Sequence, residues 1–144
     1  MDPSPGRGRS RTWRHWAARI AVTLVLIGNL SAAIPYVITP GTYASAFELD
    51  GVAGAAMVRG IGILFLMWCA AYVPVAARPD RHAALFGVIL AQQLVGLIGE
   101  IWILASLPPG HAALSATGLR YIAFDGAGLA LLILALTLSW RRSR

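Results

Sequence analysis

Hydrophobic residues occur in this chain as four long runs, which short polar segments separate. The runs cover approximately residues 17–37, 52–76, 83–106 and 118–140. A helix needs about 20 apolar residues to cross the hydrocarbon core of a bilayer, and each run is at least that long. The short connections favour antiparallel neighbours. The pattern therefore predicts an all-α fold, an integral membrane four-helix bundle with up-down topology.

The polar segments carry most of the positive charge. All 12 basic residues are arginines, and ten of them lie around the start of the first run, in the turn after the second run or in residues 141–144. The positive-inside rule places these segments in the cytoplasm, and an even number of spans agrees with this placement. The sequence therefore predicts a multi-pass protein of the inner (plasma) membrane with both termini cytoplasmic.

The composition supports a membrane location over a nucleic-acid partner. Only 12% of the residues are charged and 58% are hydrophobic, whereas about a quarter of the residues in soluble domains are charged. A formal net charge of +6 is also typical of proteins that bind nucleic acid. Here, however, the arginines bracket apolar segments and do not gather on one face. The expected partner is the lipid bilayer.

The segments at the two ends are expected to lie outside the bundle. Residues 1–16 are rich in Gly, Pro, Ser and Arg and are predicted to form a disordered cytoplasmic arm, and residues 141–144 form a basic tail. The arm, the following apolar stretch and "SAA" at 31–33 also resemble a cleavable signal peptide. Apolar character continues through residues 34–38, which favours a spanning helix instead.

Glycines recur in the last three runs, where they are expected to let helices approach closely. They are Gly54, Gly60 and Gly62 in the second run, Gly87, Gly96 and Gly99 in the third, and Gly118, Gly126 and Gly128 in the fourth.

Four ionisable residues lie inside the predicted helices: Arg59, Glu100, Arg120 and Asp125. A charge at the centre of a membrane helix costs at least about 2.5–3.5 kcal/mol on insertion scales, so each is expected to face the bundle interior. Their positions along the helices put all four in the outer half of the membrane. Since their charges sum to zero, we expect the two arginines to pair with the two carboxylates.

The spacing of polar and small residues predicts a cavity beside these charges. Gln93, Gly96 and Glu100 stand at i, i+3 and i+7 and share one face of the third helix. Tyr121 and Asp125 share one face of the fourth helix. The candidates for the aromatic walls of the cavity are Trp68, Tyr72, Trp102 and Tyr121.

Both features have a structural alternative. Buried ion pairs also fix the register of helices without any chemistry, although they stabilise a fold less well than apolar packing does. Trp102 and Tyr121, near the predicted outer boundary, also fit the aromatic belt of a membrane protein.

The chemistry that these residues favour is acid–base catalysis by Glu100 and Asp125. A carboxyl group that is protonated in an apolar cavity can act as a general acid. We expect isomerisation, protonation-initiated cyclisation or epoxide opening of a lipid-like, prenyl or aromatic substrate, with Arg59 and Arg120 as electrostatic partners. An isomerase or cyclase of this type requires no cofactor.

Redox and metal chemistry find little support in the sequence. Cys69 is the single cysteine, so neither an intramolecular disulfide nor a Cys-x-x-Cys pair can form. His15, His82 and His111 are scattered over three polar segments, and no metal site is expected.

Four segments within residues 52–135 carry the polar residues in a fixed order. They are MVRGIGILFLMWCAAYVPVAARP, QQLVGLIGE, SLPPGHAAL and LRYIAFDGAGLALL, which contain Arg59, Glu100, Arg120 and Asp125. In these segments the chain resembles the BphX-like proteins, small four-span bacterial membrane proteins of the wider DoxX-like group. The resemblance implies a four-helix membrane fold. DoxX-like relatives are associated with quinone-linked oxidoreductase complexes and membrane thiol systems, and the lone cysteine does not fit a thiol role.

Two further functions remain open. The chain is alternatively a non-catalytic membrane subunit that binds an oxidoreductase complex, with a quinone as a candidate ligand. It is less well suited to be the protomer of a small transporter, which would have to form homo-oligomers to build a path, because no pair of interrupted helices is evident.

Overall fold

A computed structural model describes the backbone of residues 6–140 and the side chains of residues 13–139. Every regular element in this part of the chain is helical. The elements are α1 (Gly6–Ile38), α2 (Pro40–Ala44), a 3-10 helix η1 (Ser45–Phe47), α3 (Gly51–Cys69), α4 (Tyr72–Ala77), α5 (Ala83–Ser106) and α6 (Ala112–Trp140).

Four of these helices are long and apolar enough to cross a membrane. The candidate spans are Trp13–Ile38, Gly51–Cys69, Ala83–Ser106 and Ala112–Ser139. The prediction of an all-α fold with four helices long and apolar enough to cross a membrane is confirmed in the described residues, and α5 has the predicted bounds.

The first helix begins earlier than predicted. Residues 6–16, which were expected to belong to a disordered arm, form the first turns of α1, while residues 1–5 and 141–144 lie outside the described part. Pro5 is the last proline before Pro35, so nothing in between removes a backbone donor from the helix. The side chain of Arg19 also lies over the Trp16 ring, 4.5 Å from its centroid.

The second predicted span is divided in two. The helix α3 ends at Cys69, and the short helix α4 follows after a turn at residues 70–71. The reason lies in Pro74, which has no N–H to donate to the carbonyl of Ala70 one turn earlier. The break brings Tyr72 into the interior, where its side chain is fully buried.

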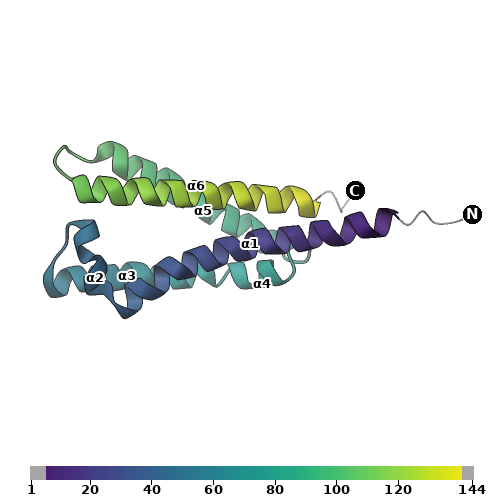
Figure 1. Cartoon of the computed structure of the whole chain (residues 1–144), viewed down its shortest axis with the longest axis horizontal. Coiled ribbons are helices and arrows are strands. Elements are labelled where there is room, and N and C mark those ends of the chain that lie inside the picture. Colours follow the sequence, from purple (N-terminus) through teal and green to yellow (C-terminus); the bar gives the residue numbers. More distant parts are fainter. Residues whose placement is uncertain (1–5, 141–144) are drawn as a thin grey trace, which may run out of the picture.

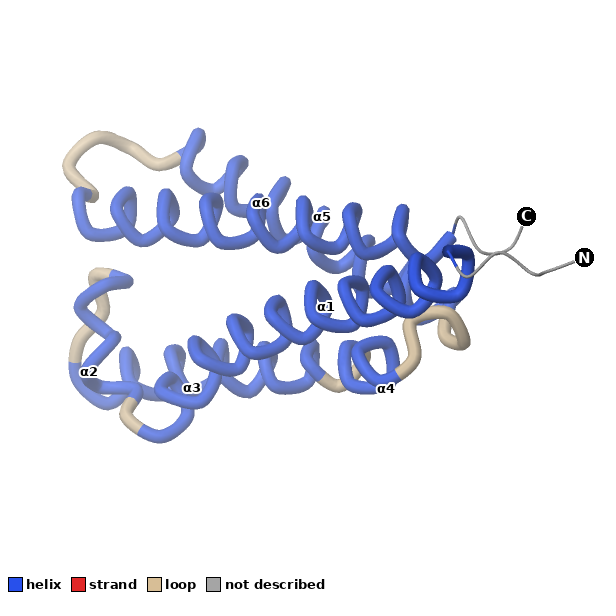
Figure 2. Tube along the Cα trace, turned by 45° about the vertical axis from the view of Figure 1, so that its right-hand side comes forward, coloured by secondary structure: helices blue, strands red, loops and turns tan. Residues whose placement is uncertain are grey.

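The helices form two pairs that α1 joins. The helix α1 packs against α3 and α4, α5 packs against α6, and α1 also crosses α6 (Figure 1). The two pairs lie close together where α1 begins and α6 ends, and they separate toward α2 and the loop between α5 and α6 (Figure 2). We call these the closed end and the open end.

The continuous hydrophobic core lies at the closed end. Its large fully buried side chains come from α1, α4, α5 and α6: Val22, Tyr72, Val75, Phe86, Ile89 and Leu132. The interior of the closed end is therefore filled, and the space between the helix pairs lies farther toward the open end.

Some of the glycines lie where two elements approach closely, and others lie in open space. A Cβ on Gly62 would lie 2.8 Å from Tyr36 Cβ and 2.9 Å from the carbonyl oxygen of Ala33 on α1. Gly54, Gly96 and Gly128 are similarly restricted. The prediction is wrong for Gly60, Gly87, Gly99 and Gly126, where an added Cβ would meet nothing within 4 Å.

At the open end, Glu48 ties the outer loop to the start of α6. Its Oε1 accepts hydrogen bonds from the backbone N–H of Ala113 (3.2 Å) and Leu114 (3.3 Å), and its Oε2 lies 2.5 Å from His111 Nδ1. The carboxylate thus caps N–H groups that have no partner within the helix. This capping explains why α6 begins at Ala112 and not near residue 118. The hydrogen bond from His111 is also the main cause that lowers the pKa of Glu48.

We predict that Gly62→Ala destabilises the bundle by about 1–3 kcal/mol, because the new methyl group would press on the backbone of α1. The measurement is thermal unfolding of the purified protein in detergent micelles. Gly60→Ala is the matched control, since it adds the same group to the same helix in open space. Equal losses in the two variants would contradict close packing at Gly62.

We predict that Glu48→Gln lowers the melting temperature, and that the difference from wild type depends on pH. Because the pKa of Glu48 is lower in the folded protein than its ordinary value of 4.5, its contribution is complete above that value and is lost as pH falls through the folded one. Melting curves from pH 7 down to pH 3 should show the two proteins converging below about pH 4.5. A difference that stays constant over this range would show that the Glu48 charge does not stabilise the fold.

Candidate functional site

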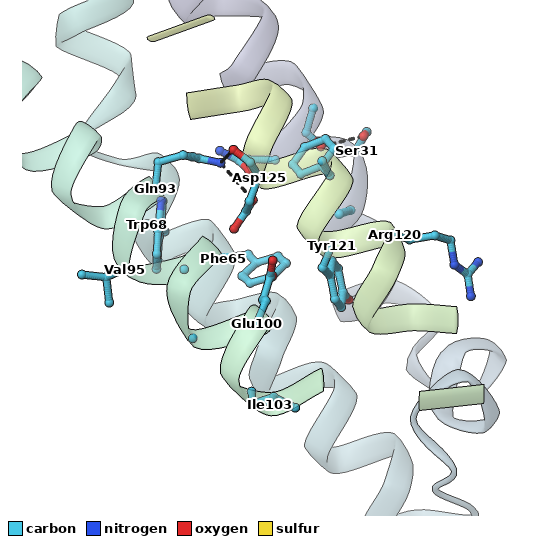
Figure 3. A pocket seen from close by; sticks show the side chains of 16 residues that line it. Ser31, Phe65, Trp68, Gln93, Val95, Glu100, Ile103, Arg120, Tyr121 and Asp125 are labelled. Atoms are coloured by element: carbon cyan, nitrogen blue, oxygen red, sulfur yellow. Dashed lines mark hydrogen bonds between the residues drawn. The ribbon is translucent and has the colours of Figure 1, made fainter. Parts of the chain in front are cut away.

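A cavity of about 480 Å³ lies between the two helix pairs. Its walls come from α1, α3, α5 and α6, and most of the lining atoms are apolar. The volume is in the range of about 300–1,000 Å³ that is typical of small-molecule sites. Figure 3 shows the lining side chains, with Glu100 and Asp125 directed into the same space. The cavity therefore brings together the two carboxyl groups that the sequence singled out.

Glu100 enters the cavity from α5 without a partner. Its Oε2 is buried and makes no hydrogen bond to any described residue. The carboxyl group and the ring of Phe65 line the same cavity. A buried acceptor without a donor is costly. Because this oxygen makes no hydrogen bond that stabilises the fold, Glu100 is available to a ligand or to a proton.

Asp125, in contrast, is held by the amide of Gln93. Gln93 Nε2 donates to Asp125 Oδ1 at 2.9 Å and to the Asp125 carbonyl oxygen at 3.3 Å. On its other side, Gln93 Oε1 accepts a hydrogen bond of 2.7 Å from the hydroxyl group of Tyr72. This bond fixes which end of the amide faces Asp125. Three helices therefore cooperate to aim one carboxylate into the cavity.

Two glycines make this arrangement sterically possible. A Cβ on Gly96 would lie 2.8 Å from Asp125 Oδ2, and a Cβ on Gly128 would lie 2.8 Å from Gln93 Nε2. Any larger residue at either position would displace the side chain that it meets. The predicted grouping of Gln93, Gly96 and Glu100 on one face of α5 places all three at the cavity.

The predicted ion pairs with arginine do not form. Arg59 is exposed and donates through Nε to the carbonyl oxygen of Val37, at 3.2 Å. Arg120 contributes to the cavity lining, yet its guanidinium extends away from Glu100 and Asp125 (Figure 3). It donates instead to the Ala116 carbonyl oxygen (3.3 Å) and to Thr117 Oγ1 (3.4 Å). Arg59 thus donates to a carbonyl oxygen of α1 and Arg120 to groups one turn earlier on its own helix, and neither is directed at a carboxylate of the cavity.

The predicted aromatic walls are right for two of the four residues. Trp68 and Tyr121 line the cavity. Tyr72 lies behind Gln93 and acts through it. Trp102 is 74% exposed on the outer surface of α5 and is not part of the site. The prediction fails for Trp102 because it is two positions from Glu100, and residues two apart do not share a helix face.

Sequence reasoning missed the contribution of α1 and of two phenylalanines. Gly28, Asn29 and Ser31 form the α1 wall, and Phe65 and Phe124 complete the aromatic surface. A phenylalanine in an apolar run carries no signal that separates a cavity from a core. Asn29 was the one available hint, and its Nδ2 is buried without a partner among the described residues.

Comparison with protein-family models, with curated protein sequences and with solved structures found no match to this chain.

Proposed function

We propose that this protein is a small membrane enzyme that uses acid–base chemistry to isomerise or cyclise an apolar, unsaturated substrate. The observation that carries the proposal is the pair Glu100 and Asp125, which share one apolar cavity and have no arginine partner. When two carboxyl groups in one site have different hydrogen-bond partners, one can act as the general acid and the other as the general base.

The hydrogen bonds suggest which group has which role. Gln93 donates to Asp125, and a donated hydrogen bond favours a carboxylate, which can accept a proton. Glu100 receives no such bond from the described residues, so the neutral acid is the form that suits its surroundings. In this proposal Glu100 is the general acid and Asp125 is the general base.

The simplest reaction is the migration of a double bond. Glu100 donates its proton to one carbon of the double bond, and the other carbon becomes cationic. Asp125 removes a proton from a carbon next to the cation, and the electrons of that C–H bond form the new double bond. The proton then returns from Asp125 to Glu100 through water before the next turnover. A substrate with a second double bond would cyclise at the cationic stage.

The aromatic side chains support a cationic intermediate. Trp68, Phe65, Tyr121 and Phe124 line the cavity that holds the two carboxyl groups, and aromatic rings attract positive charge through their faces. Val95 and Ile103, which also line the cavity, are each 67% exposed on α5. An apolar substrate would thus enter from the lipid phase, past apolar side chains.

The distribution of arginines indicates how the chain is oriented in the membrane. We infer an inner-membrane protein with both termini cytoplasmic, which the arginines around the start of α1, in the α4–α5 turn and after α6 support. A place among the BphX-like proteins rests on the sequence motifs described above.

The proposed orientation predicts which cysteine variants a membrane-impermeant maleimide will label. In a Cys69→Ser background, Pro109→Cys should react in intact cells, and Ala83→Cys should react only after permeabilisation. Both positions are exposed at opposite ends of the bundle. The reverse pattern would invert the topology.

The proposed chemistry predicts incorporation of solvent deuterium. The purified protein in lipid nanodiscs is incubated in D₂O with geranylgeraniol and with a bacterial lipid extract, and the recovered lipids are analysed by mass spectrometry. Wild type should introduce carbon-bound deuterium. Glu100→Gln and Asp125→Asn should reduce the rate by about 10²–10⁴-fold, the usual contribution of a general acid or base.

Arg59→Gln is the control, because it removes a charge from a spanning helix outside the cavity. It should retain the wild-type rate. Exchange that persists in a folded Glu100→Gln/Asp125→Asn double variant would exclude the proposed catalysis, as would a wild-type rate no higher than that of empty nanodiscs.

A further inference from the structure

The cavity holds two carboxyl groups that are not paired with any cationic side chain of the described residues. Three charged or titratable acidic and basic side chains line it, namely Glu100, Asp125 and Arg120. Arg120 lies at the rim, where its guanidinium donates to Ala116 and Thr117 and extends away from the carboxyl groups (Figure 3). The interior is therefore left with two acids and no base.

Aromatic rings surround the same space. Phe65 and Trp68 come from α3, and Tyr121 and Phe124 come from α6, so rings reach the cavity from both helix pairs. Tyr121 is held in place, since its hydroxyl group lies 2.5 Å from that of Tyr36 and its ring meets Phe65 edge to face at 6.3 Å. The face of an aromatic ring has negative potential and attracts cations most strongly where water is excluded.

The buried oxygen of Glu100 adds an independent indication. A neutral apolar ligand gives Oε2 no partner, so Glu100 meets such a ligand as the neutral acid, whereas a cationic ligand stabilises the ionised carboxylate. A ligand with positive charge in the cavity would be attracted both by the carboxyl oxygen and by the aromatic rings that line the same space. The oxygen and the rings thus select for the same kind of ligand.

We propose that this cavity is a binding site for a lipophilic organic cation, that is, a protonated amine or quaternary ammonium that carries an aryl or branched alkyl group. A cation beside Glu100 favours its ionised form over the neutral acid, so the carboxyl groups of Glu100 and Asp125 balance the ligand's charge. The aromatic rings contact its N-alkyl groups, and its apolar part fills the rest of the cavity of about 480 Å³. The inference goes beyond the proposed function because binding of a cation requires no reaction.

The test compares a cation with its neutral isostere. Benzyltrimethylammonium and neopentylbenzene have the same shape and differ in one atom, nitrogen in place of carbon, and hence in charge. Binding is measured by equilibrium dialysis against the full chain in nanodiscs of zwitterionic phosphatidylcholine, with empty nanodiscs subtracted. Wild type should bind the cation at least about tenfold more tightly than the isostere, which corresponds to about 1.4 kcal/mol and lies within the range of a single desolvated cation–π contact.

Variants then locate the charge that matters. Glu100→Gln and Asp125→Asn should each weaken binding of benzyltrimethylammonium about tenfold or more and leave neopentylbenzene unchanged. Glu48→Gln is the matched control, because it removes the same charge at the open end, outside the cavity, and it should bind the cation as wild type does.

Equal affinity of wild type for the two probes would overturn the proposal, and this comparison needs no variant to fold. Cation binding that is unchanged in both carboxyl variants would also overturn it. The outcome is separate from that of the deuterium experiment. Cation binding without deuterium exchange would refute the enzyme and keep the site, whereas exchange without selective cation binding would refute only the cation site.

Discussion

The hydrogen bond from Gln93 to Asp125 is the contact on which the interior of this bundle depends. It joins α5 to α6 at the point where the two helix pairs begin to separate. A carboxylate and a primary amide inside a membrane protein are costly unless they satisfy one another. Tyr72 completes the arrangement by fixing the amide, and it can do so only because the chain breaks after α3. A proline on one helix thereby sets the direction of a carboxyl group on another.

One end of the bundle is packed and stabilises the fold, and the other end contains the space that a ligand could enter. At the closed end, side chains from four helices fill a continuous core. Toward the open end, the helix pairs diverge, and the gap is a cavity with mostly apolar walls. The Glu48 cap keeps the start of α6 in place although little core packing supports it there. Electrostatic capping at the rim thus replaces packing where packing would remove the cavity.

The fold was largely predictable because membrane insertion imposes a simple pattern on the sequence. Length and hydropathy located all four helices, and helical spacing brought Gln93, Gly96 and Glu100 to one wall. The early start of α6 was not predictable, since it depends on Glu48, which is distant in sequence from Ala113. The ion pairs were wrongly expected for a related reason. Charge balance in a sequence does not show whether an arginine satisfies itself on nearby carbonyl groups, as Arg59 and Arg120 do.

The position of α1 determines when the cavity can exist. This first helix is the element that packs against α3 and also crosses α6, the last helix, and it supplies one wall through Gly28, Asn29 and Ser31. During synthesis, a chain that has inserted only α1 to α5 lacks Asp125 and Tyr121, so the amide N–H groups of Gln93 lack their acceptor, although Tyr72 can already donate to its Oε1. Until the last helix arrives, Gln93 and Glu100 are exposed to lipid or to the insertion machinery. Completion of the site and completion of the fold are therefore the same event, and loss of α1 by proteolysis would remove both.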